Sequence, residues 1–186
     1  TWLLPRGVLS APIGQRGALV FAAGVLQPGA VAETAARSLL ASHPGGIAAG
    51  VSGSVQATDG HAGWRQVDAA LRVALRSSTG GASVRAWADL GALRLLAFAE
   101  PGDLARTVAD GRASPLLEGD QELVRTARTY LDLAGNAQRS AAALAIHRQT
   151  LYHRLRRIEA LTGYDLDDGE DRLTLHLVLR LAAFRD

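Results

Sequence analysis

The sequence predicts an α+β fold, with a small α/β domain followed by an all-α domain. Over the first hundred residues, short apolar runs alternate with segments of helical periodicity, whereas no strand pattern occurs from Glu100 onward. The Pro and Gly at positions 101 and 102 mark the change in composition. We therefore expect a domain over residues 1–99, a linker with a short helix over 100–117, and a helical domain over 118–186.

Composition limits the classes to which the protein can belong. The 186 residues have room for two small domains, and a hydrophobic fraction of 48% is ample for a packed core. All 20 basic residues are Arg, but the net charge is only +2. Net charge is therefore weak evidence for nucleic-acid binding, and only local clusters of Arg can indicate it. The lack of Cys excludes disulfides and thiolate metal sites. No signal peptide or membrane span is predicted, a cytoplasmic location is expected, and the absence of Met suggests that the chain begins inside a longer protein.

In the first domain, residues 1–16 are expected to be irregular because Pro and Gly recur there. The elements predicted after them are strands over Gly17–Ala23, Ile47–Val51 and Ser83–Trp87, and helices over Ala30–Ser42, about 60–78, and Leu90–Phe98. Asp89 is the expected N-cap of the last helix. The apolar face of the middle helix is predicted from its spacing as Trp64, Val67, Leu71, Ala74 and Leu75.

After residue 100 only helices are predicted. A short connecting helix over Asp103–Ala109 is followed by a break over Gly111–Pro115. The longer helical segments are Glu118–Ala134, a pair within Gly135–Leu161, and Arg172–Phe184.

The stretch Gly135–Leu161 has the pattern of a helix-turn-helix. A short Ala-rich helix precedes a turn at 145–147, and a longer basic helix over 148–160 follows it. On one face of the second helix, apolar residues recur at Leu151, Leu155 and Ile158. The surface against which this face would pack is supplied by the preceding residues Ala141, Leu144 and Ile146.

The other face of the second helix carries hydrogen-bond donors, and no acidic residue occurs from Leu133 to Ile158. In helix-turn-helix proteins the N-terminal residues of the second helix contact base edges. The sequence therefore predicts double-stranded DNA as the partner. The candidate DNA-binding residues are Asn136, Gln138, Arg139, Ser140, His147, Arg148, Gln149, Thr150, Tyr152, His153 and Arg156.

Individual roles follow from position in the two helices. Asn136 is expected to cap the first helix, and the three residues Gln138, Arg139 and Ser140 lie near its start, where amides and Arg can hold phosphate. Arg148 and Gln149 are the best candidates for bidentate contacts to guanine or adenine.

Farther along the second helix, Tyr152 and His153 would follow the groove, and Arg156 would reach phosphate. Thr150 is expected either to bond phosphate or to cap its own helix. Arg154 and Arg157 are left out of the set because they can point elsewhere.

No catalytic or metal site is expected. The acidic residues from Asp165 to Asp171 lack the order of ligands that an EF-hand requires, so they are interpreted as an acidic cap on the last helix. The five His residues have no paired metal spacing, and GVSGS at 50–54 lacks the strand, GxGxxG and helix context of a nucleotide site. We therefore predict a protein that is not an enzyme and has no cofactor.

The segment GNAQRSAAALAIHRQTLYHRLRRIEALTGYDLDD, followed by EDRLTLHLVLRL, resembles the C-terminal domain of PucR/CdaR-type transcriptional regulators. Gln149 stands where Asn is common in that family, and Tyr152-His153 where an Arg-Tyr type pair is common. Upstream, GVSGSV, WRQVDAALRVAL and VRAWADLGALRLL resemble the degenerate GGDEF-like domain that precedes this helix-turn-helix. Neither Gly45-Gly46 nor Gly80-Gly81 is followed by a metal carboxylate, so the resemblance implies a non-catalytic domain.

The resemblance implies a bacterial, sequence-specific DNA-binding regulator. A homodimer is expected, since two recognition helices about 34 Å apart read a palindrome. A small-molecule effector would be bound by a region that precedes residue 1. Two alternatives remain open from the sequence: a nucleotide-binding relative of the diguanylate cyclases, and a protein-interaction module whose basic helix binds an acidic partner.

Overall fold

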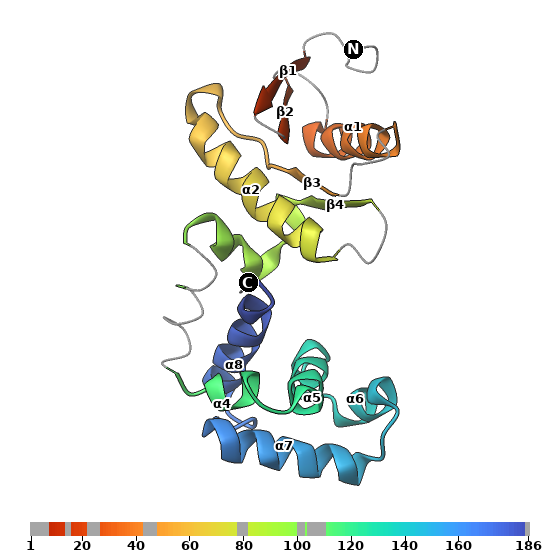
Figure 1. Ribbon diagram of the computed structural model, residues 1–186, viewed down its shortest axis with the longest axis vertical. Coiled ribbons are helices and arrows are strands. Elements are labelled where there is room, and N and C mark those ends of the chain that lie inside the picture. Colours follow the sequence, from red (N-terminus) through yellow and green to blue (C-terminus); the bar gives the residue numbers. More distant parts are fainter. Residues whose placement is uncertain are drawn as a thin grey trace. The chain divides into compact units, whose positions relative to one another are not determined.

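The chain divides into two compact units, Thr1–Phe98 and Ala99–Asp186, which we call the N-terminal and C-terminal units (Figure 1). The computed structural model describes residues 8–13, 16–21, 27–42, 48–77, 82–99, 103 and 111–184. The glycine pairs at 45–46 and 80–81 and the linker helix predicted at 103–109, apart from Asp103, lie outside the described residues.

Two small sheets form in the N-terminal unit. Strands β1 (Val8–Ile13) and β2 (Arg16–Phe21) pair antiparallel, and β3 (Ala48–Val51) and β4 (Ser83–Ala86) pair in parallel. Strand β1 corrects the prediction that residues 1–16 are irregular. A strand at the edge of a sheet tolerates Pro because some of its N–H groups have no ladder partner, so Pro12 does not prevent pairing here.

Helices α1 (Pro28–Ser42) and α2 (Gly60–Ser77) both pack against β3 and β4 (Figure 1). The crossing of α2 over β3 is close: a Cβ on Gly50 would overlap the backbone of Val67 and Leu71. The first glycine of GVSGS, Gly50, is therefore explained by the close packing of α2 on β3.

The buried face of α2 agrees with the predicted one at Ala74 but differs at its largest residues. Trp64 and Leu75 are 37% and 42% exposed, and the buried residues are mostly small: Gly63, Ala69, Ala70, Val73 and Ala74. Small side chains let the helix lie close to the strands, so the core side of α2 is rotated away from its largest apolar residues.

The segment after β4 also corrects a prediction. In place of an α-helix over 90–98 capped by Asp89, two 3₁₀ segments form, η2 (Trp87–Asp89) and η3 (Gly91–Ala97). Leu90 stands at the N-cap of η3, and no side chain caps that helix. Gly91 has φ +54, a left-handed conformation that interrupts a regular α-helix.

All the regular elements described in the C-terminal unit from residue 111 onward are helices. They are α4 (Ser114–Leu117), α5 (Gln121–Asp132), α6 (Ala137–Leu144), α7 (Arg148–Thr162) and α8 (Gly169–Ala182). Helix α4 lies where a break over 111–115 was predicted, because Pro115 falls in the first turn, where its missing N–H costs no intrahelical bond. Helix α8 begins three residues before the predicted start, since Asp168 caps it by accepting from the backbone N–H groups of Glu170 and Asp171.

One apolar core joins these helices. It is built from fully or almost fully buried residues of α4, α5, α7 and α8, together with Ala141 of α6 and two residues of the α7–α8 loop, Tyr164 and Leu166. The core fixes the position of α7, the predicted recognition helix. Within the part of the chain that the structure describes, no helix combines the length and hydropathy needed to cross a bilayer.

Candidate nucleic-acid interface

Helix α6 begins as predicted at an Asn cap. The Asn136 Oδ1 accepts a hydrogen bond from the backbone N–H of Arg139 at 2.9 Å, which satisfies one of the free amides at the helix start. Gly135, just before the cap, has φ +76, and a Cβ there would meet the Arg172 guanidinium. The Gly-Asn pair thus combines a left-handed residue with a capping side chain.

Ser140 is not available to a ligand. It is fully buried, its hydroxyl donates to the Asn136 carbonyl oxygen at 2.7 Å, and its backbone N–H donates to the same oxygen at 2.9 Å. This corrects the expectation that Ser140 holds phosphate, because both of its donors are used within α6. Gln138 and Arg139, by contrast, are exposed on the first turn of the helix.

The turn between α6 and α7 lies where it was predicted. Ala145 adopts the left-handed conformation at φ 54, and the N–H of Ile146 donates to the Ala141 carbonyl oxygen at 3.0 Å. Ile146 packs against the core, which ties the turn down. His147 then has extended backbone and occupies the N-cap position of α7 without a side-chain cap. Thr150 lies inside the first turn, so the alternative in which it caps its own helix is wrong.

The predicted buried face of α7 is confirmed. Leu151 and Ile158 are fully buried and Leu155 is nearly so. Of the predicted partner residues on the α6 side, Ala141 is buried, and Leu144 and Ile146 are partly buried against the same core. The spacing of apolar residues was sufficient to orient the helix because the buried apolar residues of α7 all lie on the one face that packs into the core.

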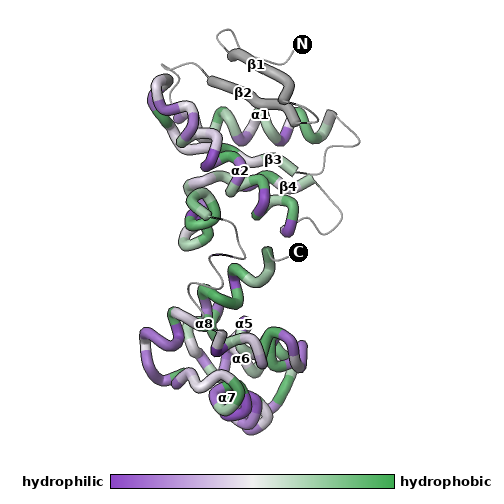
Figure 2. The backbone as a smooth tube through the Cα atoms, turned by 60° about the vertical axis from the view of Figure 1, so that its left-hand side comes forward, coloured by the Kyte–Doolittle hydropathy of each residue, from purple (hydrophilic) through white to green (hydrophobic). Residues whose placement is uncertain are grey.

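The opposite face of α7 is exposed and carries the donors named from the sequence: Arg148, Gln149, Tyr152, His153 and Arg156. Figure 2 shows the hydrophilic character of this helix. His147 and Thr150 are exposed beside them. The fold therefore presents the candidate base-reading residues together on one helix, at its N-terminal half.

Two contacts organise this exposed face. Arg148 Nη2 donates to the Tyr152 hydroxyl at 3.2 Å, and its guanidinium carbon lies 5.9 Å from the centre of the tyrosine ring. One turn farther on, Arg156 Nε donates to the Tyr152 carbonyl oxygen at 3.5 Å. The three side chains follow one another at intervals of four residues and form a line along the helix.

Arg154 is anchored to the fold. Its Nη1 lies 3.2 Å from Glu122 Oε2 and 3.2 Å from the Thr126 hydroxyl, both on α5. Its side chain is 24% exposed. Leaving Arg154 out of the DNA-binding set is consistent with this geometry, since its charge is directed toward a carboxylate of the protein.

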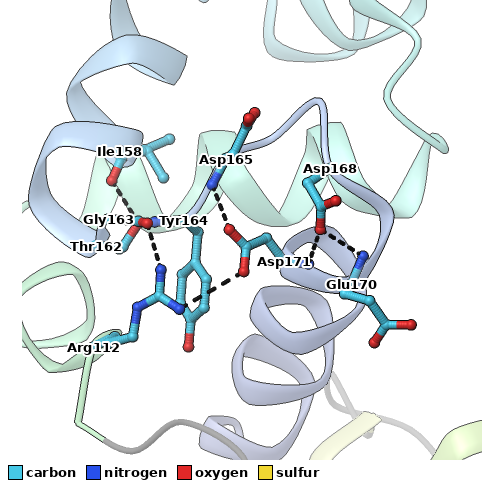
Figure 3. A network of polar contacts seen from close by, with 9 residues as sticks. All are labelled: Arg112, Ile158, Thr162, Gly163, Tyr164, Asp165, Asp168, Glu170 and Asp171. Atoms are coloured by element: carbon cyan, nitrogen blue, oxygen red, sulfur yellow. Dashed lines mark hydrogen bonds and ion pairs between the residues drawn. The ribbon is translucent and has the colours of Figure 1, made fainter.

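The acidic residues after α7 lie in a separate network, shown in Figure 3. Arg112 stacks on Tyr164 at 4.0 Å from the ring centre, donates to the Gly163 carbonyl oxygen, and lies 3.7 Å from Asp171. Asp171 also accepts from the backbone N–H of Asp165 at 2.8 Å. The network holds the loop that joins α7 to α8. No local pattern in the sequence points to Arg112, because it lies 51 residues from Gly163.

The C-terminal unit is similar to known proteins. Residues 123–181 match the PucR C-terminal helix-turn-helix domain family. The match covers helices α6 and α7 and most of α5 and α8. The chain is 52% identical over 42 residues to the carbohydrate diacid regulator of Escherichia coli (strain K12), covering 23% of this chain and 11% of that protein. It is 37% identical over 62 residues to the purine catabolism regulatory protein of Bacillus subtilis (strain 168), covering 33% and 12%.

A third relative is the "Uncharacterized protein in pkwA 5'region" of Thermomonospora curvata, 36% identical over 80 residues, which are 41% of this chain and 44% of that protein. The chain thus spans about a tenth of the length of the two regulators and less than half of the third relative. No solved structure matches the chain. The family model thus matches the helix-turn-helix of the C-terminal unit from residue 123 onward, and two of the relatives are named as regulators.

Proposed function

We propose that this chain is part of a bacterial transcriptional regulator that binds a specific DNA operator, with α7 in the major groove. The observation that carries the proposal is the exposed face of α7, whose side chains Arg148, Gln149, Tyr152, His153 and Arg156 can all donate hydrogen bonds. The PucR-type domain match over the same helix supports it. A donor-rich, acid-free helix face suits the phosphates and the guanine and adenine edges of a duplex.

The proposed contacts fall into two groups. Arg148 and Gln149, in the first turn of α7, would contact base edges, with Tyr152 and His153 farther along the groove. Arg156 on α7 and the exposed Gln138 and Arg139 at the start of α6 would contact phosphate, which positions the helix without reading sequence. His147 and Thr150 are exposed beside the base-reading group and complete the proposed interface, with Asn136 holding the start of α6.

The proposal extends to the assembly. Two copies would place their α7 helices in successive major grooves about 34 Å apart, which predicts a palindromic operator. The N-terminal unit would be a degenerate, non-catalytic GGDEF-like domain, supported by the sequence resemblance over GVSGSV and the two motifs that follow it. A small-molecule effector would bind outside the 186 residues, in keeping with the names of the two regulators, which refer to small metabolites.

Selection of bound sequences from random duplex DNA tests the function directly. The expected result is one enriched, palindromic motif, bound with an affinity that falls as salt concentration rises, because Arg contacts to phosphate release counterions. Absence of an enriched motif together with an affinity insensitive to salt would overturn the proposal. In that case, saturable binding of GTP would favour a nucleotide-binding protein, and binding to an acidic protein partner would favour an interaction module.

A further inference from the structure

We propose that Arg148 and Tyr152 form one base-reading unit, in which Tyr152 positions the arginine for a guanine base; this rests on the proposed function. Arg148 Nη2 donates to the Tyr152 hydroxyl at 3.2 Å, and the guanidinium also lies 5.9 Å from the ring centre. The two residues are four apart on α7, so their side chains lie on the same side of the helix.

Holding the arginine matters because its side chain is long and exposed. Arg148 lies in the first turn of α7 and has many rotamers available to it in water. A side chain restrained by a hydrogen bond and a ring loses less conformational freedom when it binds. The side chain of Tyr152 is 43% exposed, but its backbone is held in α7 next to the buried Leu151. Tyr152 therefore restricts Arg148 without being part of the core.

The chemistry of the pair selects the base. Because the tyrosine oxygen accepts from Arg148, its own O–H remains available as a donor. The free groups of the unit are then mostly donors: the remaining guanidinium N–H groups and the phenolic O–H, beside one remaining lone pair of the phenolic oxygen. Among the bases, guanine presents two neighbouring acceptors, N7 and O6, in the major groove, whereas adenine presents N7 beside a donor. A unit whose free groups are mostly donors, with a guanidinium that cannot accept, therefore favours guanine over adenine at the same place.

Arg156 provides an internal comparison within the same line of residues. Its Nε contacts the carbonyl oxygen of Tyr152 at 3.5 Å, which is a backbone atom. Removing the tyrosine hydroxyl leaves that contact in place. Tyr152 thus has a side-chain link to Arg148 and a separate main-chain link to Arg156, and the two links can be distinguished by substitution.

The test begins with the operator selected from random duplexes by the whole 186-residue chain. Affinities are then measured for that operator, for variants in which each guanine is replaced in turn by adenine, and for an unrelated duplex of the same length. The proteins are wild type, Tyr152→Phe, Arg148→Ala, Arg156→Ala, and the two double variants that combine Tyr152→Phe with either arginine substitution. Thermal unfolding of each protein verifies that it folds.

Tyr152→Phe should reduce the discrimination against adenine at one guanine by about 2- to 10-fold, the range that one net hydrogen bond corresponds to. The loss should be absent when Arg148 is already Ala, so the double variant should match Arg148→Ala alone. The matched control combines Tyr152→Phe with Arg156→Ala, whose effects should multiply independently.

The outcomes separate the two proposals. If an operator is selected but Tyr152→Phe leaves discrimination unchanged at every guanine, or acts equally with Arg148 and with Ala at position 148, the paired unit is overturned and the regulator stands. If no operator is selected at all, the proposed function fails and this inference fails with it.

Discussion

Arg154 of α7 and Glu122 of α5 form an ion pair, with Nη1 3.2 Å from Oε2, across 32 residues of sequence. The same Nη1 also donates to the hydroxyl of Thr126, which is fully buried and itself donates to the Glu122 carbonyl oxygen at 2.7 Å. Arg154 therefore links α7 to α5 in addition to their shared apolar core, on the side away from the proposed DNA contacts.

Arg154→Ala should lower the free energy of unfolding by about 0.5–1.5 kcal/mol, the range for one net hydrogen bond with a partly exposed ion pair. Urea denaturation of the chain provides the measurement. The matched control is Arg125→Ala, because Arg125 lies 3.9 Å from the same carboxylate but is 64% exposed. Equal effects of the two substitutions would contradict an anchoring role for Arg154.

Helices α6 and α7 each end at a residue in the left-handed conformation, and substitutions at these two residues should change the free energy of unfolding in opposite directions. Ala145 at φ 54 is strained, whereas Gly163 at φ 67 is not. Ala145→Gly should raise the free energy of unfolding by about 0.5–1 kcal/mol, since relief of about 1–2 kcal/mol outweighs the added freedom of the unfolded chain. Gly163→Ala should lower it by about 1 kcal/mol for the converse reason. Chemical denaturation of both variants provides the measurement, and a loss of stability in Ala145→Gly would show that the turn is not strained.

Arg148→Ala and Arg156→Ala should change DNA binding in different ways. Loss of Arg148 should cost about 1–3 kcal/mol of discrimination at one base pair of the operator, with the fold intact. Loss of Arg156 should weaken binding to all sequences similarly and reduce the salt slope by about one unit. Titration of operator and unrelated duplexes at several salt concentrations measures both effects. Normal operator binding by Arg148→Ala would mean that α7 is oriented differently in the groove.

Gly50→Ala should destabilise the N-terminal unit by about 1–3 kcal/mol, because the added methyl overlaps the backbone of Val67 and Leu71 and neither can move without shifting α2. Gly60→Ala is the control. A Cβ at position 60 meets nothing within 4 Å and its φ is −57, so this substitution should be neutral or stabilising. Amide hydrogen exchange locates the effect: Gly50→Ala should speed exchange in α2 and leave exchange in α5 unchanged. Unchanged or slower exchange in α2 would contradict the close crossing.

Alkaline pH should destabilise the C-terminal unit through Tyr130. Burial raises the pKa of its hydroxyl above the ordinary value, and the positive charge of Arg172 opposes this only in part. The unfolded chain then loses its tyrosine proton at a lower pH than the folded chain. Stability is therefore retained below about pH 10 and falls as the pH rises above that value. Denaturation between pH 8 and 11, compared with Tyr130→Phe, measures this, and an equally steep alkaline loss in that variant would exclude Tyr130 as the cause.

The sequence by itself determined the helix-turn-helix and its orientation. Leu151, Leu155 and Ile158 recur at helical spacing, so the buried side of α7 follows from local periodicity, and the exposed donors follow by exclusion. The Asn136 cap was equally predictable, because capping depends on residues within one turn.

Only the tertiary structure decided which polar residues face inward. Ser140 is fully buried by the packing around α6, Arg154 pairs with Glu122 of α5, and Arg112 reaches Gly163 across 51 residues. The buried side of α2 likewise depends on how closely Gly50 lets it approach β3. These relationships depend on contacts between segments far apart in the chain or on how tightly two elements pack, and periodicity within one segment carries no information about its partner.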